Sequence, residues 1–131
     1  MKETKLTREY TVTEDMLAVN FGSGSVRVLA TPKVAAFFEG TAAELAQKSL
    51  EEPFTTVGSV ITVEHLAPTA LGCKVSVTAE LTEIDGRTYR FKLEAYDNAG
   101  LIATGTHERV SVKKDRFEEK AEARKNTARQ G

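Results

Sequence analysis

Residues 74–96 have the sequence KVSVTAELTEIDGRTYRFKLEAY, and this stretch decides the fold class. Apolar and polar residues alternate from Val75 to Leu81 and again from Tyr89 to Ala95. A period of two places the apolar side chains on one face of a strand. Between the two runs stands Asp85-Gly86, a residue pair favoured in tight hairpin turns. The stretch therefore predicts two antiparallel strands that share an apolar face.

Weaker patterns on both sides of this hairpin extend the predicted sheet. The segment 97–100 (DNAG) predicts a second turn, followed by a strand over residues 101–113. Residues 56–66 and, less clearly, residues 5–13 have the apolar spacing of two further strands. We thus expect about five strands, the last of them antiparallel because short turns join them.

One segment ahead of these strands predicts a long helix over about residues 32–49. Thr31 is a good N-cap residue, and Pro32 is favoured at the first helical position. Apolar residues at helical spacing then form one stripe, made by Val34, Phe38, Ala42 and Leu45. A single helix covers one face of a sheet. The element order therefore predicts an α+β fold in which the helix packs across the sheet.

Length and composition exclude several classes of protein. The chain has 131 residues, which is the size of one domain, with 18 Lys+Arg against 19 Asp+Glu. The near-zero net charge gives no electrostatic case for binding nucleic acid or an anionic membrane. No apolar run approaches the roughly 18–20 residues that span a bilayer. The N-terminus lacks the apolar region of a secretory signal, so we expect a cytoplasmic protein.

Cysteine and histidine content argues against a metal centre. Cys73 is the only cysteine, which excludes an internal disulfide framework and a Cys-rich zinc site. The two histidines, His65 and His107, lack the spacing of paired metal ligands. For His107, inside a charged strand segment, an exposed or cross-strand-paired side chain is favoured. The alternative is that the charges of this segment line an interface or a pocket.

Three polar residues stand where they could take part in chemistry. Glu39 lies at the border of the helical apolar stripe, where it either reaches solvent or serves as a base or nucleophile. Thr31 either caps the helix or holds a carbonyl or a water, and these roles are compatible. His65 shares a strand face with Ile61 and Val63, which favours a core residue. Imidazole is also the side chain best suited to proton transfer near neutral pH.

The C-terminal tail, residues 114–131, is predicted to be separate from the domain formed by residues 1–113. It carries six basic and four acidic residues, so its net charge is +2. Only Phe117 and Ala121 form an apolar i, i+4 pair. A short solvated helix is the favoured interpretation, and a basic arm that reaches for a phosphate is the alternative.

The element order and several short motifs together resemble the fluoroacetyl-CoA thioesterase-like branch of the hot-dog fold. The resembling stretches lie within residues 26–113 and comprise VLATP (28–32), Glu39 eight residues after Thr31, VGS (57–59), VEHLAPTALG (63–72), VTAEL (77–81) and GTHER (105–109). No single motif decides the match, but their order and spacing are specific together.

This resemblance implies an antiparallel sheet of about five strands wrapped around one long helix. It also implies a homodimer or tetramer with active sites between subunits, acyl-CoA as substrate, and no metal or redox cofactor. The residues of the branch that carry catalysis fall on Thr31, Glu39 and His65. The resemblance further assigns Gly58 as a backbone N–H donor and Arg109 as a pocket or interface contact.

The substrate and the reaction keep alternatives at this stage. The fluoroacetate-resistance enzyme carries an aromatic-bearing lid before its helix, whereas residues 20–25 (NFGSGS) contain only Phe21. We therefore expect a hydrolase of small or medium acyl-CoA thioesters, with no selectivity for fluoroacetyl. The alternative is a non-catalytic hot-dog module that binds acyl-CoA or an acyl carrier as sensor or scaffold. A hydratase is weaker, because Val60 stands where that branch has an Asp, five residues before His65.

Overall fold

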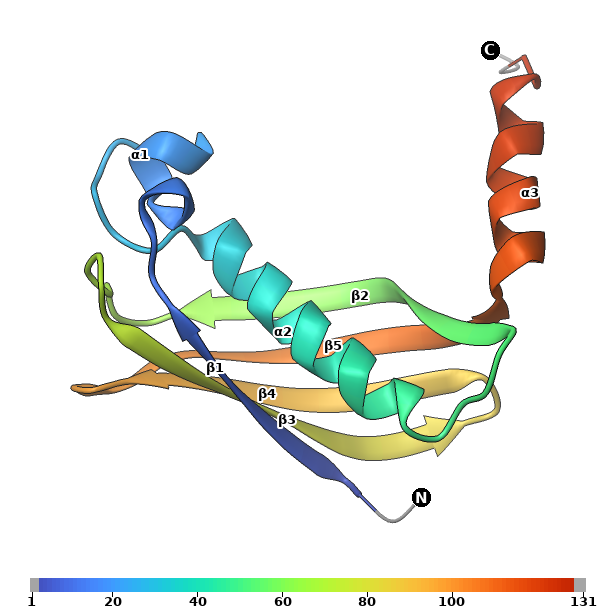
Figure 1. Ribbon diagram of the computed structural model, residues 1–131, viewed down its shortest axis with the longest axis horizontal. Helices are drawn as coiled ribbons and strands as arrows, with labels where there is room; N and C mark the ends of the chain where they lie inside the picture. The colour runs from blue at the N-terminus through green and yellow to red at the C-terminus, as the bar shows by residue number, and fades with distance from the viewer. Residues whose placement is uncertain (1–2, 129–131) are drawn as a thin grey trace.

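The structure is a computed structural model that describes residues 3–128, in which one long helix crosses an antiparallel sheet (Figure 1). The elements in chain order are β1 (Lys5–Thr11), the 3-10 turn η1 (Glu14–Met16), α1 (Ala18–Phe21), α2 (Thr31–Gln47), β2 (Phe54–His65), β3 (Lys74–Asp85), β4 (Thr88–Asp97), β5 (Gly100–Lys113) and α3 (Lys114–Lys125). The expected α+β fold, with five strands and one long helix, is confirmed.

The five strands form one sheet in the order β1-β3-β4-β5-β2, and all neighbours are antiparallel. The turn between β3 and β4 contains Gly86 with φ of 63°, a conformation that glycine adopts without a steric penalty. The turn between β4 and β5 falls at Asn98-Ala99, as the sequence predicts. β1 and β2 are the two edges of the sheet, and β2 lies beside the last strand.

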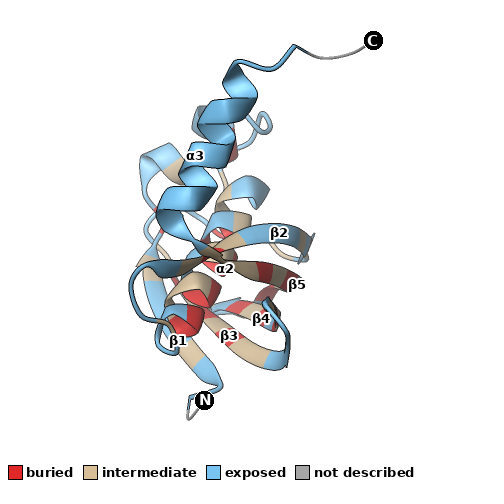
Figure 2. Cartoon of the chain, turned by 90° about the vertical axis from the view of Figure 1, so that its right-hand side faces the viewer, coloured by how far each residue is buried: buried red, intermediate tan, exposed pale blue. Residues whose placement is uncertain are grey.

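The core lies between α2 and the sheet (Figure 2). The predicted apolar stripe of α2 is fully buried, and the alternating residues of the central strands face it, with Val75, Val77, Ala79, Phe91 and Leu93 at 2% exposure or less. The helix approaches β5 closely where Gly105 faces Phe38. A Cβ at Gly105 would lie 2.9 Å from the Phe38 ring and 2.4 Å from the carbonyl oxygen of Thr62.

The start of α2 differs from the expectation in one respect. Ala30 is the N-cap residue, and Thr31 is the first residue of the helix, followed by Pro32. No side chain caps this helix, so the N-cap role predicted for Thr31 is wrong. Position 31 lies inside the first turn, and its side chain is therefore available to the neighbouring strand end.

The segment between β1 and α2 is more structured than the plain loop that the sequence suggests. Leu17 and Leu29 pair as an isolated antiparallel bridge, and both side chains are buried. Backbone hydrogen bonds join Ala18 N–H to the Val28 carbonyl and Leu29 N–H to the Thr69 carbonyl. This segment, residues 12–30, therefore packs over one end of α2, and we call it the cover segment.

Helix α3 has no buried residue and rises from the end of β5 on the same side of the sheet as α1 (Figure 1). Its first residue, Lys114, coincides with the predicted start of the tail, and residues 129–131 of that tail lie outside the described residues. In residues 3–128, no helix combines the length and the apolar character needed to cross a membrane.

Candidate active site

The first part of the site joins the start of α2 to the end of β2. The Thr31 Oγ1 atom lies 2.7 Å from Nδ1 of His65, within hydrogen-bonding distance. The Nε2 atom of the same ring is buried and has no hydrogen-bond partner within residues 3–128. Burial lowers the pKa of His65, so the imidazole is neutral near pH 7. We call Thr31 and His65 the Thr–His half-site.

An open pocket of about 330 Å³ lies against the Thr–His half-site. Its walls come from the cover segment before α2 and from the turn after β2. Besides Thr31 and His65, the lining side chains are small or aliphatic, namely Ala18, Ser23, Gly24, Val26, Val28, Leu29, Leu66, Ala67 and Pro68. Phe21, the aromatic residue of this segment, is 45% exposed and does not line the pocket. The pocket therefore presents a small, largely apolar space beside a neutral imidazole.

The second part of the site is a buried arginine on β5. Arg109 is 8% exposed, and its Nε and Nη2 atoms donate hydrogen bonds to the hydroxyl and the carbonyl of Thr56 at 2.8 and 3.0 Å. Its Nη1 atom lies 3.2 Å from Nε2 of His107. With three bonds on two neighbouring strands, the guanidinium has a fixed position and a fixed orientation.

The tautomer of His107 follows from its two partners. Its Nδ1 atom lies 2.7 Å from the Val60 carbonyl oxygen, which only accepts, so Nδ1 carries the proton. Its Nε2 atom then accepts from Arg109, which only donates. Burial lowers the pKa of His107, and the charge of Arg109 acts in the same direction. The ring is 2% exposed, so the predicted exposed side chain is wrong, whereas the predicted cross-strand pairing is confirmed by the bond to Val60 on β2.

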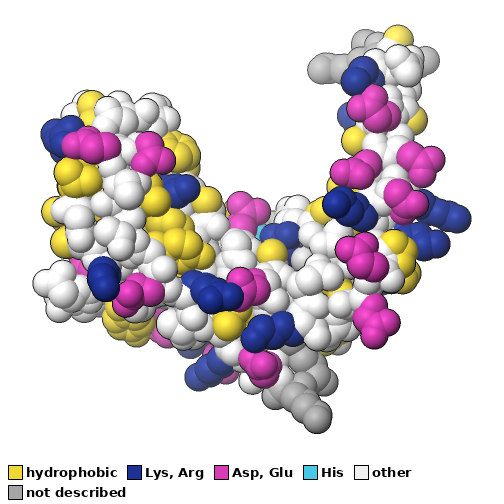
Figure 3. All heavy atoms as spheres, viewed as in Figure 1, with side chains coloured by type: hydrophobic (Ala, Val, Ile, Leu, Met, Phe, Trp, Pro, Cys, Tyr) yellow, Lys and Arg dark blue, Asp and Glu magenta, His cyan; other side chains and the backbone are white. Residues whose placement is uncertain are grey.

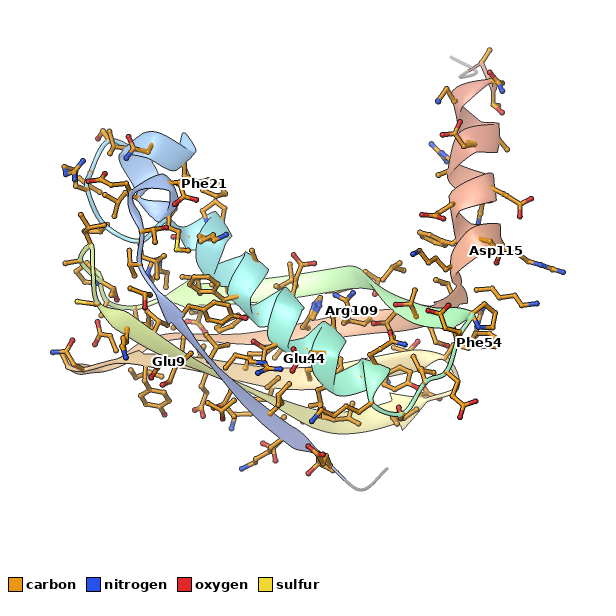
Figure 4. All side chains as sticks on the ribbon, in the orientation of Figure 1. Glu9, Phe21, Glu44, Phe54, Arg109 and Asp115 are labelled. Carbon is orange, nitrogen blue, oxygen red and sulfur yellow. The ribbon has the colours of Figure 1, made fainter. Side chains whose placement is uncertain are left out.

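Glu39 and Gly58 complete this second part. The Oε2 atom of Glu39 lies 4.0 Å from Nη1 of Arg109, and 46% of the Glu39 side chain is exposed. A Cβ at Gly58 would lie 2.8 Å from that oxygen, 3.2 Å from Cε1 of His107 and 3.3 Å from Nη1 of Arg109. Only a residue without a side chain leaves the carboxylate open here. We call Glu39, Gly58, His107 and Arg109 the Glu–Arg half-site (Figure 4).

The two half-sites are separate within one chain. Thr31 and Glu39 are eight residues apart on α2, which is about 12 Å along the helix axis. His65 and Gly58 stand at opposite ends of an eight-residue stretch of β2. The structure thus brings Thr31 to His65 and Glu39 to Gly58 and Arg109, but it does not bring the two groups together. One thioester carbonyl cannot contact both half-sites of the same chain.

One member of the Glu–Arg half-site, His107, was not among the site residues predicted from the sequence. The usable signal was its place two residues before Arg109, since residues i and i+2 of a strand share a face. A buried partner for an interior arginine is then expected at that position. Within residues 3–128, no group of three or more His, Cys, Asp or Glu side chains is placed to hold a metal ion.

Comparisons with known proteins match the sequence and the fold to a class. The fluoroacetyl-CoA thioesterase of Streptantibioticus cattleyicolor is 33% identical over 93 residues, which cover 71% of this chain and 67% of that protein. A solved structure of the fluoroacetyl-CoA thioesterase superposes with a TM-score of 0.86 at 27% identity and covers 98% of both chains. A hot-dog-like protein from Thermanaerovibrio acidaminovorans gives the same TM-score and identity, over 96% of this chain and 93% of its own.

Fold and matches together define the class, which is that of the hot-dog thioester hydrolases. The sequence model of one family, described as fluoroacetyl-CoA-specific thioesterase, matches residues 12–115. The chain belongs to this family. The matched range contains both half-sites and ends at the first turn of α3.

Proposed function

We propose that the protein hydrolyses small acyl-CoA thioesters to the free acid and CoA, at sites shared by two copies of the chain. The observation that carries this proposal is the division of the candidate residues into two half-sites that one chain holds apart. The type of reaction is taken from the relatives, one of which is named as a thioesterase for fluoroacetyl-CoA. One solved relative is a complex with fluoroacetate and CoA.

The proposed role of the Glu–Arg half-site is attack on the carbonyl carbon. The Glu39 carboxylate either adds to that carbon and forms an anhydride that water then cleaves, or it removes a proton from an attacking water. Both routes break the C–S bond and yield acid and thiol. Gly58 lets the thioester approach its backbone closely, so its N–H is assigned to the carbonyl oxygen as a hydrogen-bond donor. Arg109 provides fixed positive charge beside the developing oxyanion.

The proposed role of the Thr–His half-site is to stabilise the leaving sulfur by a hydrogen bond. If the Thr31 hydroxyl donates to Nδ1 of His65, the neutral ring carries its proton on Nε2. That atom is buried and unpartnered among the described residues, so its N–H is free to donate a hydrogen bond to the leaving sulfur. The proton that completes the thiol comes from the water that supplies the oxygen of the free acid. A carboxylate, a hydroxyl and an imidazole suffice for this reaction, and the proposal therefore includes no metal or redox cofactor.

A homodimer through β2 would unite the half-sites. Among the edge strands, β1 is short and carries Lys5, Arg8 and Glu9, whereas the 12 residues of β2 include one carboxylate, Glu64. A long edge with few charges is the better template for pairing with another strand. If two β2 strands pair antiparallel about a two-fold axis between Ile61 and Thr62, Gly58 of one copy stands opposite His65 of the other.

The same two-fold rotation, applied to α2, would place Glu39 of one copy near Thr31 of the other, because Ala35 lies midway between these two positions. The small side chains of Ala35 and Ala36, which are not buried, leave room on α2 for a second helix. The proposal does not distinguish a dimer from a tetramer built from two such dimers. It includes a cytoplasmic location, which a free Cys73 fits.

The experiment that tests the function is a hydrolysis screen with purified protein. We expect thiol release from acetyl-CoA and other short acyl-CoA thioesters. Activity should fall as the acyl chain of the substrate becomes too long for the pocket beside His65. Fluoroacetyl-CoA belongs in the panel, and the small residues of the cover segment predict no preference for it over acetyl-CoA. Glu39→Gln should abolish turnover, and full activity in that variant would refute the role of Glu39.

A matched control variant is Glu44→Gln, which removes a carboxylate from the same helix. Glu44 forms an exposed ion pair with Arg8 and is not part of either half-site. It should keep wild-type activity. If the wild-type protein binds acetyl-CoA but releases no thiol over hours, the non-catalytic module replaces the hydrolase.

A further inference from the structure

A second hollow, which the proposed chemistry does not use, lies at the foot of α3. It has a volume of about 490 Å³ and is lined by Phe54, Arg87, Val110, Ser111, Val112, Lys113, Arg116, Phe117 and Lys120. Four of these side chains are cations and none is a carboxylate. We call this hollow the basic pocket.

The four cations of the basic pocket have no compensating carboxylates. Within residues 3–128, neither Arg87, Lys113, Arg116 nor Lys120 forms an ion pair within 4.0 Å. The carboxylates of α3 lie on the other side of the helix, where Asp115, Glu118, Glu119 and Glu122 line a different hollow. Figure 3 shows both kinds of charge along α3. Clustered cations repel one another, so a bound polyanion would stabilise this arrangement.

The walls of the basic pocket are tied together by the backbone. The Ser111 N–H donates to the Arg87 carbonyl at 2.9 Å, which fixes the β3–β4 turn to β5. The Lys114 N–H donates to the Pro53 carbonyl at 3.0 Å, which fixes the foot of α3 to the start of β2. The β3–β4 turn, β5 with the foot of α3, and the start of β2 are therefore held in place before a ligand binds.

Two exposed aromatic rings stand among the cations. Phe54 is 45% exposed and Phe117 is 42% exposed, although a solvated helix and a strand end need neither ring. A flat aromatic base stacks favourably on such rings, while lysine and arginine bind phosphates. The combination fits a ligand with both an aromatic base and several phosphates.

We propose that the basic pocket binds the phosphorylated adenosine end of acyl-CoA, an inference that rests on the proposed hydrolysis of acyl-CoA. That end of CoA carries an adenine ring, a diphosphate and a 3′-phosphate. The proposal also gives α3 a function, because Arg116 and Lys120 come from that helix.

The distance from the Glu–Arg half-site suits this assignment. Lys113 follows Arg109 by four residues on β5, and Phe54 precedes Gly58 by four residues on β2. Four residues of strand span about 13 Å. The pantetheine arm of CoA has about as many main-chain bonds as four to five residues, so it extends to about 16 Å. A thioester beside Glu39 therefore places its phosphates at the basic pocket; Figure 4 labels Arg109 of the half-site and Phe54 of the pocket.

The test compares two substrates that differ only in the nucleotide. Acetyl-CoA carries it, whereas S-acetyl-pantetheine lacks it. In the double variant Arg116→Gln/Lys120→Gln, we expect the KM for acetyl-CoA to rise about tenfold or more, because two charge-assisted contacts are lost. Turnover of S-acetyl-pantetheine should not change. The KM for acetyl-CoA should also rise with salt in the wild-type protein, and less so in the variant.

The matched control is Lys114→Gln/Lys125→Gln, which removes two charges from the same helix outside the basic pocket. This control should leave the KM for acetyl-CoA and the turnover of S-acetyl-pantetheine unchanged. A KM for acetyl-CoA that changes no more in Arg116→Gln/Lys120→Gln than in this control would overturn the proposal. An equal loss with S-acetyl-pantetheine would also overturn it, since the variant would then act on the Glu–Arg half-site itself.

A binding measurement separates this proposal from the proposed function. Calorimetric titration with CoA needs no turnover, and we expect a Kd at least about tenfold weaker in Arg116→Gln/Lys120→Gln than in the wild-type protein. If the protein hydrolyses nothing yet shows this difference, the hydrolase is refuted and the basic pocket stands. If it hydrolyses acetyl-CoA with no difference in Kd, the basic pocket is refuted and the hydrolase stands.

Discussion

The two half-sites of this protein are built in opposite ways. The Thr–His half-site rests on one hydrogen bond, at the start of a helix and the end of a strand, beside an open pocket. In the Glu–Arg half-site, Arg109 donates three hydrogen bonds from a buried position. The first has an imidazole nitrogen, Nε2 of His65, without a partner among the described residues, and the second has a fixed positive charge. We infer from this comparison a division of labour in which stabilisation of the leaving sulfur and attack on the carbonyl carbon come from different copies of the chain.

The strongest test of this division mixes two inactive variants. We expect Glu39→Gln and His65→Ala each to lower kcat about a thousandfold or more, since each removes one half-site function. After the two proteins are unfolded and refolded together, half of the dimers combine one chain of each kind. Each such dimer has one intact site, so roughly a quarter of wild-type activity should return.

Activity that stays at the level of the separate variants would show that both half-sites must come from one chain. A mixture of Glu39→Gln with wild-type protein serves as the control for refolding yield. The oligomeric state, measured by light scattering at micromolar concentration, should be a dimer or a tetramer. A monomer would contradict the shared site directly.

Two glycines separate an effect on the Glu–Arg half-site from an effect on the fold. In Gly58→Ala, the new Cβ meets the end of the Glu39 side chain at 2.8 Å, and that side chain can move away. We expect kcat/KM to fall about tenfold to a hundredfold with little change in the melting temperature. In Gly105→Ala, the Cβ meets the Thr62 carbonyl at 2.4 Å, so the opposite result is expected, a clear loss of stability. Thermal unfolding and acetyl-CoA hydrolysis distinguish the two outcomes.

His107 is expected to position Arg109 rather than to touch the substrate. In His107→Phe, the Val60 carbonyl and Nη1 of Arg109 both lose a partner, and we expect a several-fold loss of kcat with a loss of about 1–3 kcal/mol in the free energy of unfolding. His107→Gln keeps one donor and one acceptor and should recover most of the activity. A purely structural role would lower stability in His107→Phe and leave kcat unchanged.

The sequence predicts the fold better than it predicts the site, and particular residues show why. Alternation over residues 74–96 and the stripe on α2 are local patterns, so strand and helix positions follow from them. The edge position of β2 depends on pairing between distant segments, which no local pattern encodes. Thr31 was expected to cap α2, but the end of β2 brings His65 to its hydroxyl. His107 was expected to be exposed or paired across strands, and the structure has it buried, with a bulge in β2 between Gly58 and Val60 that accompanies its cross-strand bond to the Val60 carbonyl.

The same comparison predicts how stability depends on pH. Burial lowers the pKa of His107 below its ordinary value of 6.5, and the charge of Arg109 acts in the same direction. The hydrogen bond to the Val60 carbonyl and the charges of Glu39 and Glu108 oppose this shift. As the pH falls below about 6.5, the unfolded chain binds a proton that the folded chain does not, so the free energy of unfolding decreases. The loss is at most about 1.4 kcal/mol per pH unit for one group.

Denaturant titrations at pH 7.5 and at pH 5.5 measure this loss. His107→Gln should show a smaller decrease between the two pH values than the wild-type protein, because its amide does not titrate. His65→Gln is the matched comparison from the Thr–His half-site, where burial also lowers the histidine pKa. Since His107 is 2% exposed and His65 only half-buried, we expect the larger effect from His107. An equal or larger effect from His65 would show that the Glu–Arg half-site is not the more rigidly buried of the two.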